Sequence, residues 1–268
     1  MLGTLIKNRL MQRTRKSPPV DQRGELERRL PDASPAEIDL ILETQPTTMT
    51  SPERIVGLIR AIDYVSKQNI PGDIVECGVW RGGSMFAAAK SLLRHNDVDR
   101  TLWLYDTFEG MSEPTSADVD LRGLAAGDLM RRDEPADRFG VWCVSRLDEV
   151  RQTLASSGYS KERINFVEGP VEKTLLSLRP SRIALLRLDT DWYESTKCEL
   201  EQLFPLLVEG GVLIIDDYGH WKGCREAVDE YFCKTGIRMH LARLDYTGRI
   251  GIKTASQPDL VSRREDVR

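Results

Sequence analysis

Short apolar runs typical of strands alternate with helical segments along the middle of the chain, and no other feature restricts its fold as strongly. Strands are predicted at 73–78, 101–106, 164–167, 182–189 and 212–217, with helices over 82–94 and about 194–204. Parallel strands need a crossover between them, and a right-handed helical crossover packs back onto the sheet. We therefore predict an α/β fold with a doubly wound, mostly parallel sheet covered by helices on both faces.

The chain departs from this alternation in three places. Residues 237–244 and 249–254 are β-like runs joined by Asp245-Tyr-Thr-Gly, which predicts a hairpin and a sheet of seven strands with one antiparallel member. Residues 111–140 form a long polar insertion after the second strand, and loops of this length often act as lids. Before residue 73, helices are predicted from Pro35, capped by Ser34, and from Pro52, capped by Ser51.

These features divide the chain into a basic and helical extension over 1–45, an α/β domain over 46–255 and a charged tail over 256–268. A linker is expected over 17–22, where the sequence contains Ser-Pro-Pro. In the helix from Pro52, apolar residues such as Ile55, Ile59 and Ile62 recur at helical spacing, so one of its faces is expected to be buried. A leader over 17–60 with such an apolar face predicts a homodimer.

Composition excludes several classes of protein. The 268 residues are 40% hydrophobic and 30% charged, which is typical of a globular domain and not of a disordered chain. The longest apolar runs are far shorter than the ~20 residues of a membrane span. The five cysteines are odd in number, widely spaced and never in a CxxC pair, which predicts reduced thiols and no zinc site. We therefore expect a cytoplasmic protein.

Charge is distributed unevenly along the chain. Residues 1–16 carry five basic side chains and no acid, so with an overall charge of −4 the other 252 residues carry −9. An acidic body repels phosphate, so we expect no nucleic-acid partner. The basic segment is predicted to form a short amphipathic helix that contacts a membrane surface weakly, or that simply frays or packs at the terminus.

The first motif with chemical meaning is Glu76-Cys-Gly-Val-Trp-Arg-Gly-Gly-Ser84, where an acid closes a strand and glycines lead into a helix. Glycine lets a ligand approach the backbone, and a helix start offers free N–H groups. The dinucleotide fingerprint is absent, and Glu76 would repel phosphate, so a cationic ligand such as S-adenosylmethionine is favoured. Asp106, at the end of the next strand, is placed to accept two ribose hydroxyls. The alternative is that each acid only begins a turn.

A second motif brings acids to the ends of two consecutive strands, Asp189-Thr-Asp191 and Asp216-Asp217. Ligands of a doubly wound sheet lie beyond the carboxyl ends of its strands, so four carboxylates are expected to meet there. Their repulsion is relieved most simply by a divalent cation, and all-oxygen ligands favour Mg²⁺, with Mn²⁺ or Ca²⁺ as alternatives. Asp191, two residues beyond Asp189, is free to face the substrate. The alternative is again that these acids cap separate turns.

Aromatic residues and one histidine lie beside these acids in the sequence. His220 either orients the substrate and shares a proton or is a solvated residue at a helix start. Trp192, Tyr193 and Trp221 either stack on an acceptor or pack in the core.

Four segments together resemble a known family, the macrocin and novobiocin type O-methyltransferases. They are Gly72-Asp-Ile-Val-Glu-Cys-Gly-Val-Trp-Arg-Gly-Gly-Ser, Leu104-Tyr-Asp-Thr-Phe-Glu-Gly, Leu188-Asp-Thr-Asp-Trp-Tyr-Glu-Ser-Thr and Ile215-Asp-Asp-Tyr-Gly-His-Trp-Lys-Gly. The similarity extends from about Thr48 to Thr254, without the basic N-terminus. It implies a class I, Rossmann-like methyltransferase that uses S-adenosylmethionine and Mg²⁺ to methylate a hydroxyl, commonly of a deoxysugar on a glycosylated natural product or glycolipid.

The resemblance also implies roles for individual residues. The metal ligands of the family fall on Asp189, Asp216 and Asp217, and its general base falls on Asp191. The insertion over 111–140 matches a mobile region that covers the acceptor. The cofactor-binding positions fall on a larger set: Thr48, Met49, Glu76, Gly78, Val79, Trp80, Ser84, Asp106, Thr107, Gly110 and Gly169.

Other functions fit parts of the sequence. Asp189-Thr-Asp191 is also a D-x-D motif, with which a glycosyltransferase holds a nucleotide sugar through Mn²⁺ or Mg²⁺. A non-catalytic subunit with a methyltransferase fold is a further alternative, and an NAD dehydrogenase fits less well because the glycine pattern is missing. The acceptor itself is not encoded in a readable motif, and catechols or other diols stay open beside glycosides.

Overall fold

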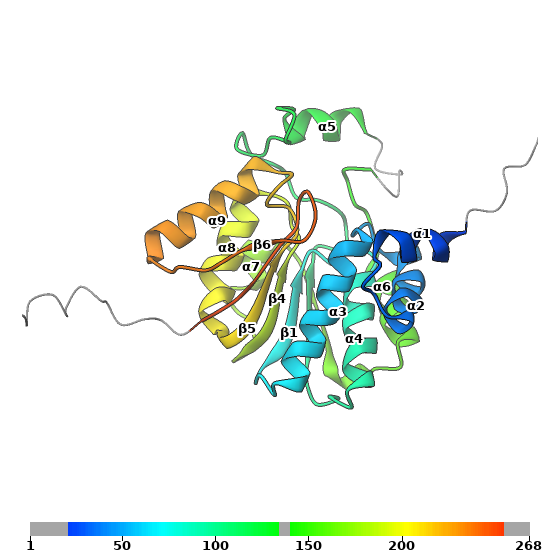
Figure 1. The fold of residues 1–268 in the computed structure, drawn as a ribbon. Helices are drawn as coiled ribbons and strands as arrows, with labels where there is room; N and C mark the ends of the chain where they lie inside the picture. Colours follow the sequence, from blue (N-terminus) through cyan, green and yellow to red (C-terminus); the bar gives the residue numbers. More distant parts are fainter. Residues whose placement is uncertain (1–20, 134–139, 255–268) are drawn as a thin grey trace, which may run out of the picture.

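The alternation of strands and helices builds a layered structure in the computed structural model, which describes residues 21–133 and 140–254 (Figure 1). Within these residues one sheet has the strand order β3-β2-β1-β4-β5-β7-β6. Strands β1 to β5 pair in parallel, and β7 is antiparallel to both of its neighbours, β5 and β6. This confirms the predicted sheet. The strands are β1 Asp73–Cys77, β2 Leu102–Asp106, β3 Ile164–Glu168, β4 Ile183–Leu188, β5 Leu207–Ile215, β6 Ala242–Arg243 and β7 Arg249–Ile252.

Helices cover both faces of the sheet, and each face has its own hydrophobic cluster. One face packs against α3 (Pro52–Lys67), α4 (Gly83–Arg94) and α6 (Leu147–Ser156). The other packs against α7 (Val171–Thr174), α8 (Tyr193–Leu203) and α9 (Lys222–Thr235), and Figure 1 shows these two groups on opposite sides of the strands. Because both faces are covered, β4 is buried along its whole length, as expected for a central parallel strand.

The N-terminal part packs onto this unit through a third hydrophobic cluster. This N-terminal part consists of the helices α1 (Gln22–Arg29) and α2 (Pro35–Thr44) and the short 3₁₀ turn η1 (Gln45–Thr47). Helix α1 was not predicted from the sequence. Ser34 and Glu37 form a capping box at the start of α2, the arrangement that the sequence favours there. Cluster residues come from α1, α2, α3 and α4 together, so the packing crosses the boundary expected at residue 45.

The apolar face of α3 does not support the expected homodimer. Ile55, Ile59 and Ile62 are each 1% exposed or less, and they pack against other parts of the same chain. The feature from which we predicted a second copy is therefore already covered within one chain. The basic residues 1–16 and the tail over 256–268 lie outside the described residues.

The hairpin is shorter than predicted, and its loop is fixed by one side chain. The strand expected over 237–244 pairs only at Ala242–Arg243. In the loop, Asp245 Oδ1 accepts hydrogen bonds from the backbone N–H groups of Thr247 at 2.9 Å and Gly248 at 2.7 Å. Strand β5, by contrast, begins earlier than predicted, at Leu207. No helix among the described residues is both long and apolar enough to cross a membrane.

The topology places the sequence motifs at one edge of the sheet. β1 lies between β2 and β4, which is the switch point where α/β sheets bind ligands. In the parallel register Cys77 pairs with Leu188, and Leu188 with Ile215. The glycine-rich turn after β1, the Asp189–Asp191 turn after β4 and Asp216–Asp217 after β5 therefore emerge side by side.

Candidate active site

A single cavity occupies this edge, with a volume of about 1110 Å³ including its open mouth. Its walls come from the ends of β1, β2, β4 and β5, from residues 47–50 before α3, and from the start of the insertion. The four acids Asp189, Asp191, Asp216 and Asp217 line it. So do all of the predicted cofactor positions except Glu76, namely Thr48, Met49, Gly78, Val79, Trp80, Ser84, Asp106, Thr107, Gly110 and Gly169.

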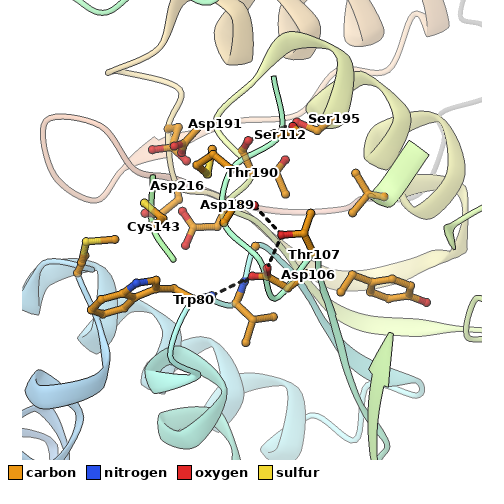
Figure 2. A pocket seen from close by; sticks show the side chains of 18 of the residues that line it. Trp80, Asp106, Thr107, Ser112, Cys143, Asp189, Thr190, Asp191, Ser195 and Asp216 are labelled. Carbon is orange, nitrogen blue, oxygen red and sulfur yellow. Dashed lines mark hydrogen bonds between the residues drawn. The ribbon is translucent and has the colours of Figure 1, made fainter. Parts of the chain in front are cut away.

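Asp106 holds the turn after β1 in shape. Its Oδ2 accepts hydrogen bonds from the N–H groups of Val79 at 2.6 Å and Trp80 at 3.0 Å (Figure 2). Its Oδ1 accepts from the N–H of Phe108 at 2.8 Å. Burial raises the pKa of this carboxyl, against the effect of the three N–H donors. Asp106 thus has the turn-forming role of the alternative interpretation, and it also lines the cavity where the ribose was predicted.

The glycines of this turn are required by close packing. Gly78 has a φ of 80°, and a Cβ there would lie 1.9 Å from the carbonyl oxygen of Asp189. A Cβ at Gly83, the first residue of α4, would lie 2.6 Å from the carbonyl oxygen of Thr47. The Thr47–Thr48 segment therefore crosses the start of α4, where the N-cap residue is Gly82 and no side chain caps the helix. Free N–H groups at this end are suited to a carboxylate.

Glu76 lies behind the cavity, in an ion pair with an arginine. It is 1% exposed and sits directly opposite Arg187 in the register of β1 and β4. The guanidinium of Arg187 contacts Glu76, and also donates to Asp189 Oδ2 at 2.6 Å and to Thr50 Oγ1 at 2.9 Å. Burial raises the pKa of Glu76 despite this partner. One of its oxygens, Oε2, is buried without a hydrogen-bond partner among the described residues.

Asp216 is also occupied by arginines. Its Oδ1 accepts from Arg187 at 2.6 Å, and its Oδ2 contacts Arg54. Arg54 comes from the first turn of α3 and pairs in addition with Asp245 at 3.0 Å. Two arginines that the sequence analysis did not single out thus neutralise much of the acidic edge.

Three carboxylates remain facing one another. Asp189, Asp191 and Asp217 each place one oxygen within 4.8 Å of the others. Burial raises the pKa of Asp191 to about 7, and burial together with repulsion from Asp191 and Asp189 holds the pKa of Asp217 well above its usual range. The Oδ2 atom of Asp217 is buried without a hydrogen-bond partner in the described part of the chain. A divalent cation fits such a set of oxygens.

The left-handed backbone at Asp191 produces this grouping. Its φ of 68° is uncommon outside glycine, although aspartate tolerates it better than most residues. Figure 2 shows Asp189, Asp191 and Asp216 grouped above Trp80 and Asp106. The structure therefore brings all four predicted acids to one place. Asp189 and Asp216 contact arginines, whereas Asp191 and Asp217 have no arginine partner among the described residues.

Comparison with known proteins identifies the fold and the activity. The sequence matches the family model described as Macrocin-O-methyltransferase (TylF) over residues 25–250. The chain belongs to the TylF family. The family model covers residues 25–45 of the predicted extension and the α/β region as far as β7.

Individual relatives agree with this TylF-family assignment. A Streptomyces olivaceus protein, 8-demethyl-8-(2,3-dimethoxy-alpha-L-rhamnosyl)-tetracenomycin-C 4'-O-methyltransferase, is 36% identical over 226 residues, which are 84% of this chain and 83% of that protein. Demethyldecarbamoylnovobiocin O-methyltransferase of Streptomyces niveus is 36% identical over 201 residues, 75% of this chain and 73% of that protein. A solved structure of the O-methyltransferase NovP has a TM-score of 0.66 at 34% identity and covers 78% of this chain and 82% of its own.

This TylF-family chain is therefore an O-methyltransferase of an S-adenosylmethionine-dependent family. The glycosyltransferase, the dehydrogenase and the non-catalytic subunit that the sequence left open do not agree with this result. In this chain the D-x-D spacing arises because Asp189 and Asp191 both lie in the turn that follows β4.

Sequence reasoning missed Arg54 and Arg187 in this TylF-family site, although one signal was present. Arg187 interrupts an otherwise apolar run, Ile183–Leu188, predicted to be buried on both faces. A charged side chain in such a strand is almost never buried without a partner. Glu76 interrupts β1 in the same way, so the two could have been paired across neighbouring strands. Arg54 carried no comparable signal.

A buried acid lies behind the Asp189–Asp191 turn. Glu199 of α8 has no exposed surface, and its Oε1 accepts a hydrogen bond from the Thr190 hydroxyl at 2.8 Å. Burial holds the pKa of Glu199 well above its usual range. Glu199 therefore supports Thr190, the middle residue of the turn, from behind.

The aromatic residues of the motifs pack more than they line the cavity. Trp192 and Trp221 are 2% and 5% exposed, with ring centroids 4.9 Å apart. The Tyr193 hydroxyl donates to Glu230 on the outer side of α8 and α9. His220 contacts the Tyr246 hydroxyl through Nδ1 at 3.3 Å, and burial lowers its pKa. Of these residues, Trp221 lines the cavity.

Proposed function

We propose that this enzyme methylates a hydroxyl of a sugar, commonly a deoxysugar, carried by a glycosylated small molecule or glycolipid. The Streptomyces olivaceus relative is named for the 4'-hydroxyl of a tetracenomycin rhamnoside, which supports a sugar acceptor. The observation that carries the proposal is the group of three carboxylates, Asp189, Asp191 and Asp217, at the end of the cavity that adjoins the Gly78–Trp80 turn. A sugar offers adjacent hydroxyls, which match a site rich in oxygen ligands.

The cofactor side of the cavity fits S-adenosylmethionine. The start of α4 offers N–H groups for its carboxylate, and the unpartnered Oε2 of Glu76 is a nearby acceptor for a cationic group. Asp106 and the Val79–Trp80 backbone would bind the nucleoside, and Thr48 and Met49 would cover the methionine end. When bound, S-adenosylmethionine supplies a methyl group on a positively charged sulfur.

The acidic side fits a divalent cation, for which Mg²⁺ is the first choice and Mn²⁺ or Ca²⁺ the alternatives. Asp189, Asp216 and Asp217 would hold it. A carboxylate oxygen has more than one lone pair, so Asp216 can keep its arginine partners while it does so. When bound, the cation lowers the pKa of a hydroxyl that it contacts.

Asp191 would take the proton of the acceptor hydroxyl. Its raised pKa, about 7, suits a general base that works near neutral pH. The chain contributes mainly by holding the acceptor oxygen and the methyl carbon in line, because the donor is already activated and positioning supplies much of the rate.

Mass spectrometry of candidate acceptors tests this function. Rhamnosides and other deoxysugar glycosides, the corresponding aglycones and simple catechols are incubated with isotopically labelled S-adenosylmethionine, with and without EDTA. We expect one added methyl group on the glycosides alone, and no product after chelation. Methylation of the aglycone or of catechols in preference to the sugar would refute the acceptor class, and a product insensitive to EDTA would refute the cation.

A pair of variants separates the base from the ligands. Asp191→Asn should lower kcat even at saturating Mg²⁺, whereas Asp216→Asn should raise the Mg²⁺ concentration needed for half-maximal activity. If Asp191 were a ligand and Asp216 only an ion-pair partner, the Mg²⁺ requirement would shift in Asp191→Asn instead. This comparison should come first, because Asp191 faces two of the proposed metal ligands, Asp189 and Asp217.

A further inference from the structure

The first half of the insertion is bound to α8, the helix that follows the Asp189–Asp191 turn, mainly through one buried carboxylate. Asp118 has no exposed surface. Its Oδ1 accepts a hydrogen bond at 2.7 Å from the backbone N–H of Tyr193, the first residue of α8. Its Oδ2 accepts from the backbone N–H of Thr115 at 2.6 Å and from the Thr115 hydroxyl at 2.9 Å. The carboxylate therefore joins the insertion to α8.

The start of α9 leaves room for this carboxylate. Gly223 is the second residue of α9, and a Cβ there would lie 2.2 Å from Asp118 Oδ1. One residue earlier, the N–H of Lys222 donates to the carbonyl of Val119 at 2.9 Å. Asp118 thus lies between the N-terminal ends of α8 and α9, where helix dipoles favour a negative charge. Gly223 does not form a turn. A glycine is needed there because any larger residue would displace the Asp118 carboxylate.

Both residues that follow Asp191 are held by the insertion. The indole N–H of Trp192 donates to the carbonyl of Ser112 at 3.0 Å, and Tyr193 is held by Asp118. Asp191 itself has a left-handed backbone, a conformation that persists only where the surroundings fix it. Along the chain, Asp191 therefore lies between Thr190, whose hydroxyl is held by Glu199, and these two contacts with the insertion.

We propose that Asp118 is a positioning residue for the methyl transfer: through Tyr193 and α8 it holds the turn that carries Asp191. The inference rests on the proposed role of Asp191 as the general base. Asp118 is not among the residues that line the cavity, so it acts through the turn and not on the substrate. A displacement of a catalytic group by about 1 Å can lower a rate about 100-fold.

Asp118→Asn tests the proposal with little change of volume. All three partners of the carboxylate are donors, so the amide NH₂ of asparagine must face at least one of them and a hydrogen bond is lost. We expect kcat to fall at least about tenfold, while the affinity for S-adenosylhomocysteine, measured by calorimetry, changes less than about twofold. Asp128→Asn is the matched control, because Asp128 lies in the same insertion and its side chain is 53% exposed.

A double-mutant cycle adds a readout that general destabilisation would not give. Gly223→Ala should displace the Asp118 carboxylate and lower kcat on its own. In the Asp118→Ala background the same change should have a much smaller effect, because the side chain that the new Cβ would displace is no longer there. Additive effects on log kcat would contradict the proposal. So would an Asp118→Asn enzyme with the kcat of Asp128→Asn, or one that loses cofactor affinity in proportion to kcat.

A milder variant keeps the test decisive if Asp118→Asn does not fold. Thr115→Val removes one hydrogen bond to the carboxylate and keeps the shape of the side chain, and kcat should fall by about threefold or more. An unchanged kcat would overturn the proposal. The measurements use any acceptor that the wild-type enzyme methylates, so a failure of the proposed glycoside class is seen in the wild type alone and is distinct from a failure at Asp118.

Discussion

Replacing Asp191 and Asp216 by asparagine should change the stability of the metal-free enzyme in opposite directions. Asp191 places an oxygen within 4.8 Å of oxygens of both Asp189 and Asp217. Two charges at that distance repel by about 3 kcal/mol at an effective dielectric constant of about 20. Asp191→Asn removes the cost of desolvating this charge and its repulsion from the neighbouring carboxylates, but leaves a half-buried polar side chain, so we expect a gain of about 1–3 kcal/mol.

Asp216→Asn has the reverse effect because its carboxylate is shared by two arginines. Arg187 donates to Asp216 Oδ1 at 2.6 Å, and Arg54 contacts Oδ2. Removal of one partner from a buried ion pair leaves uncompensated charge and costs about 3 kcal/mol or more. Two chemically identical substitutions, close together at one edge of the sheet, should therefore differ by about 4 kcal/mol or more.

Thermal unfolding at pH 8 in EDTA measures this difference. The pH matters because burial raises the pKa of Asp191 to about 7. The cost to the folded state is absent below the unfolded pKa of about 4, grows between about 4 and 7, where only the unfolded chain ionises, and is constant above about 7. In a protein of this size 1 kcal/mol corresponds to about 2–4 °C. A lower Tm for Asp191→Asn than for the wild type at pH 8 would refute the division into paired and unpaired acids.

Three further predictions follow from the same site. Mg²⁺ should bind more tightly as the pH rises from about 6 to 8, because the ion displaces protons from Asp191 and Asp217; calorimetry in two buffers of different ionisation enthalpy measures the released protons, and an affinity independent of pH would contradict it. Gly78→Ala should lower the free energy of unfolding by about 2 kcal/mol or more, since its Cβ would meet the Asp189 carbonyl at 1.9 Å; chemical denaturation measures this. Glu199→Gln should keep nearly full kcat, and Glu199→Leu should lose about tenfold, because only glutamine still accepts from the Thr190 hydroxyl; equal kcat values would show that the hydrogen bond has no role.

Most of the sheet could be predicted because its signals are local. The strands are short apolar runs separated by helices, and their ends fall within a few residues of the predicted ones in β1 to β4. The hairpin was predicted too long because Ile237 and its neighbours are apolar enough for a strand, but among the described residues the strand pairing begins only at Ala242. The helix α1 was missed because its charged sequence has a single buried residue, Leu26.

The positions of the acids followed from the sequence, but their partners did not. Asp189, Asp191, Asp216 and Asp217 end two consecutive parallel strands, and the right-handed crossover forces such ends to one edge of the sheet. The order of the acids along the chain therefore determined that a carboxylate cluster exists. The sequence did not indicate which of these carboxylates are neutralised by other side chains.

Only the tertiary structure decided how that cluster is divided. Arg54 reaches Asp216 from a helix far earlier in the chain, and Arg187 faces Glu76 because β1 and β4 pair in one particular register. Asp118 reaches Tyr193 because the insertion folds back over α8 and α9. Contacts of this kind depend on packing between elements distant in sequence, and side-chain pairing across such distances leaves no periodic pattern to read. The sequence by itself determined the sheet, its edge and its acids, and packing determined which of those acids stay free to act.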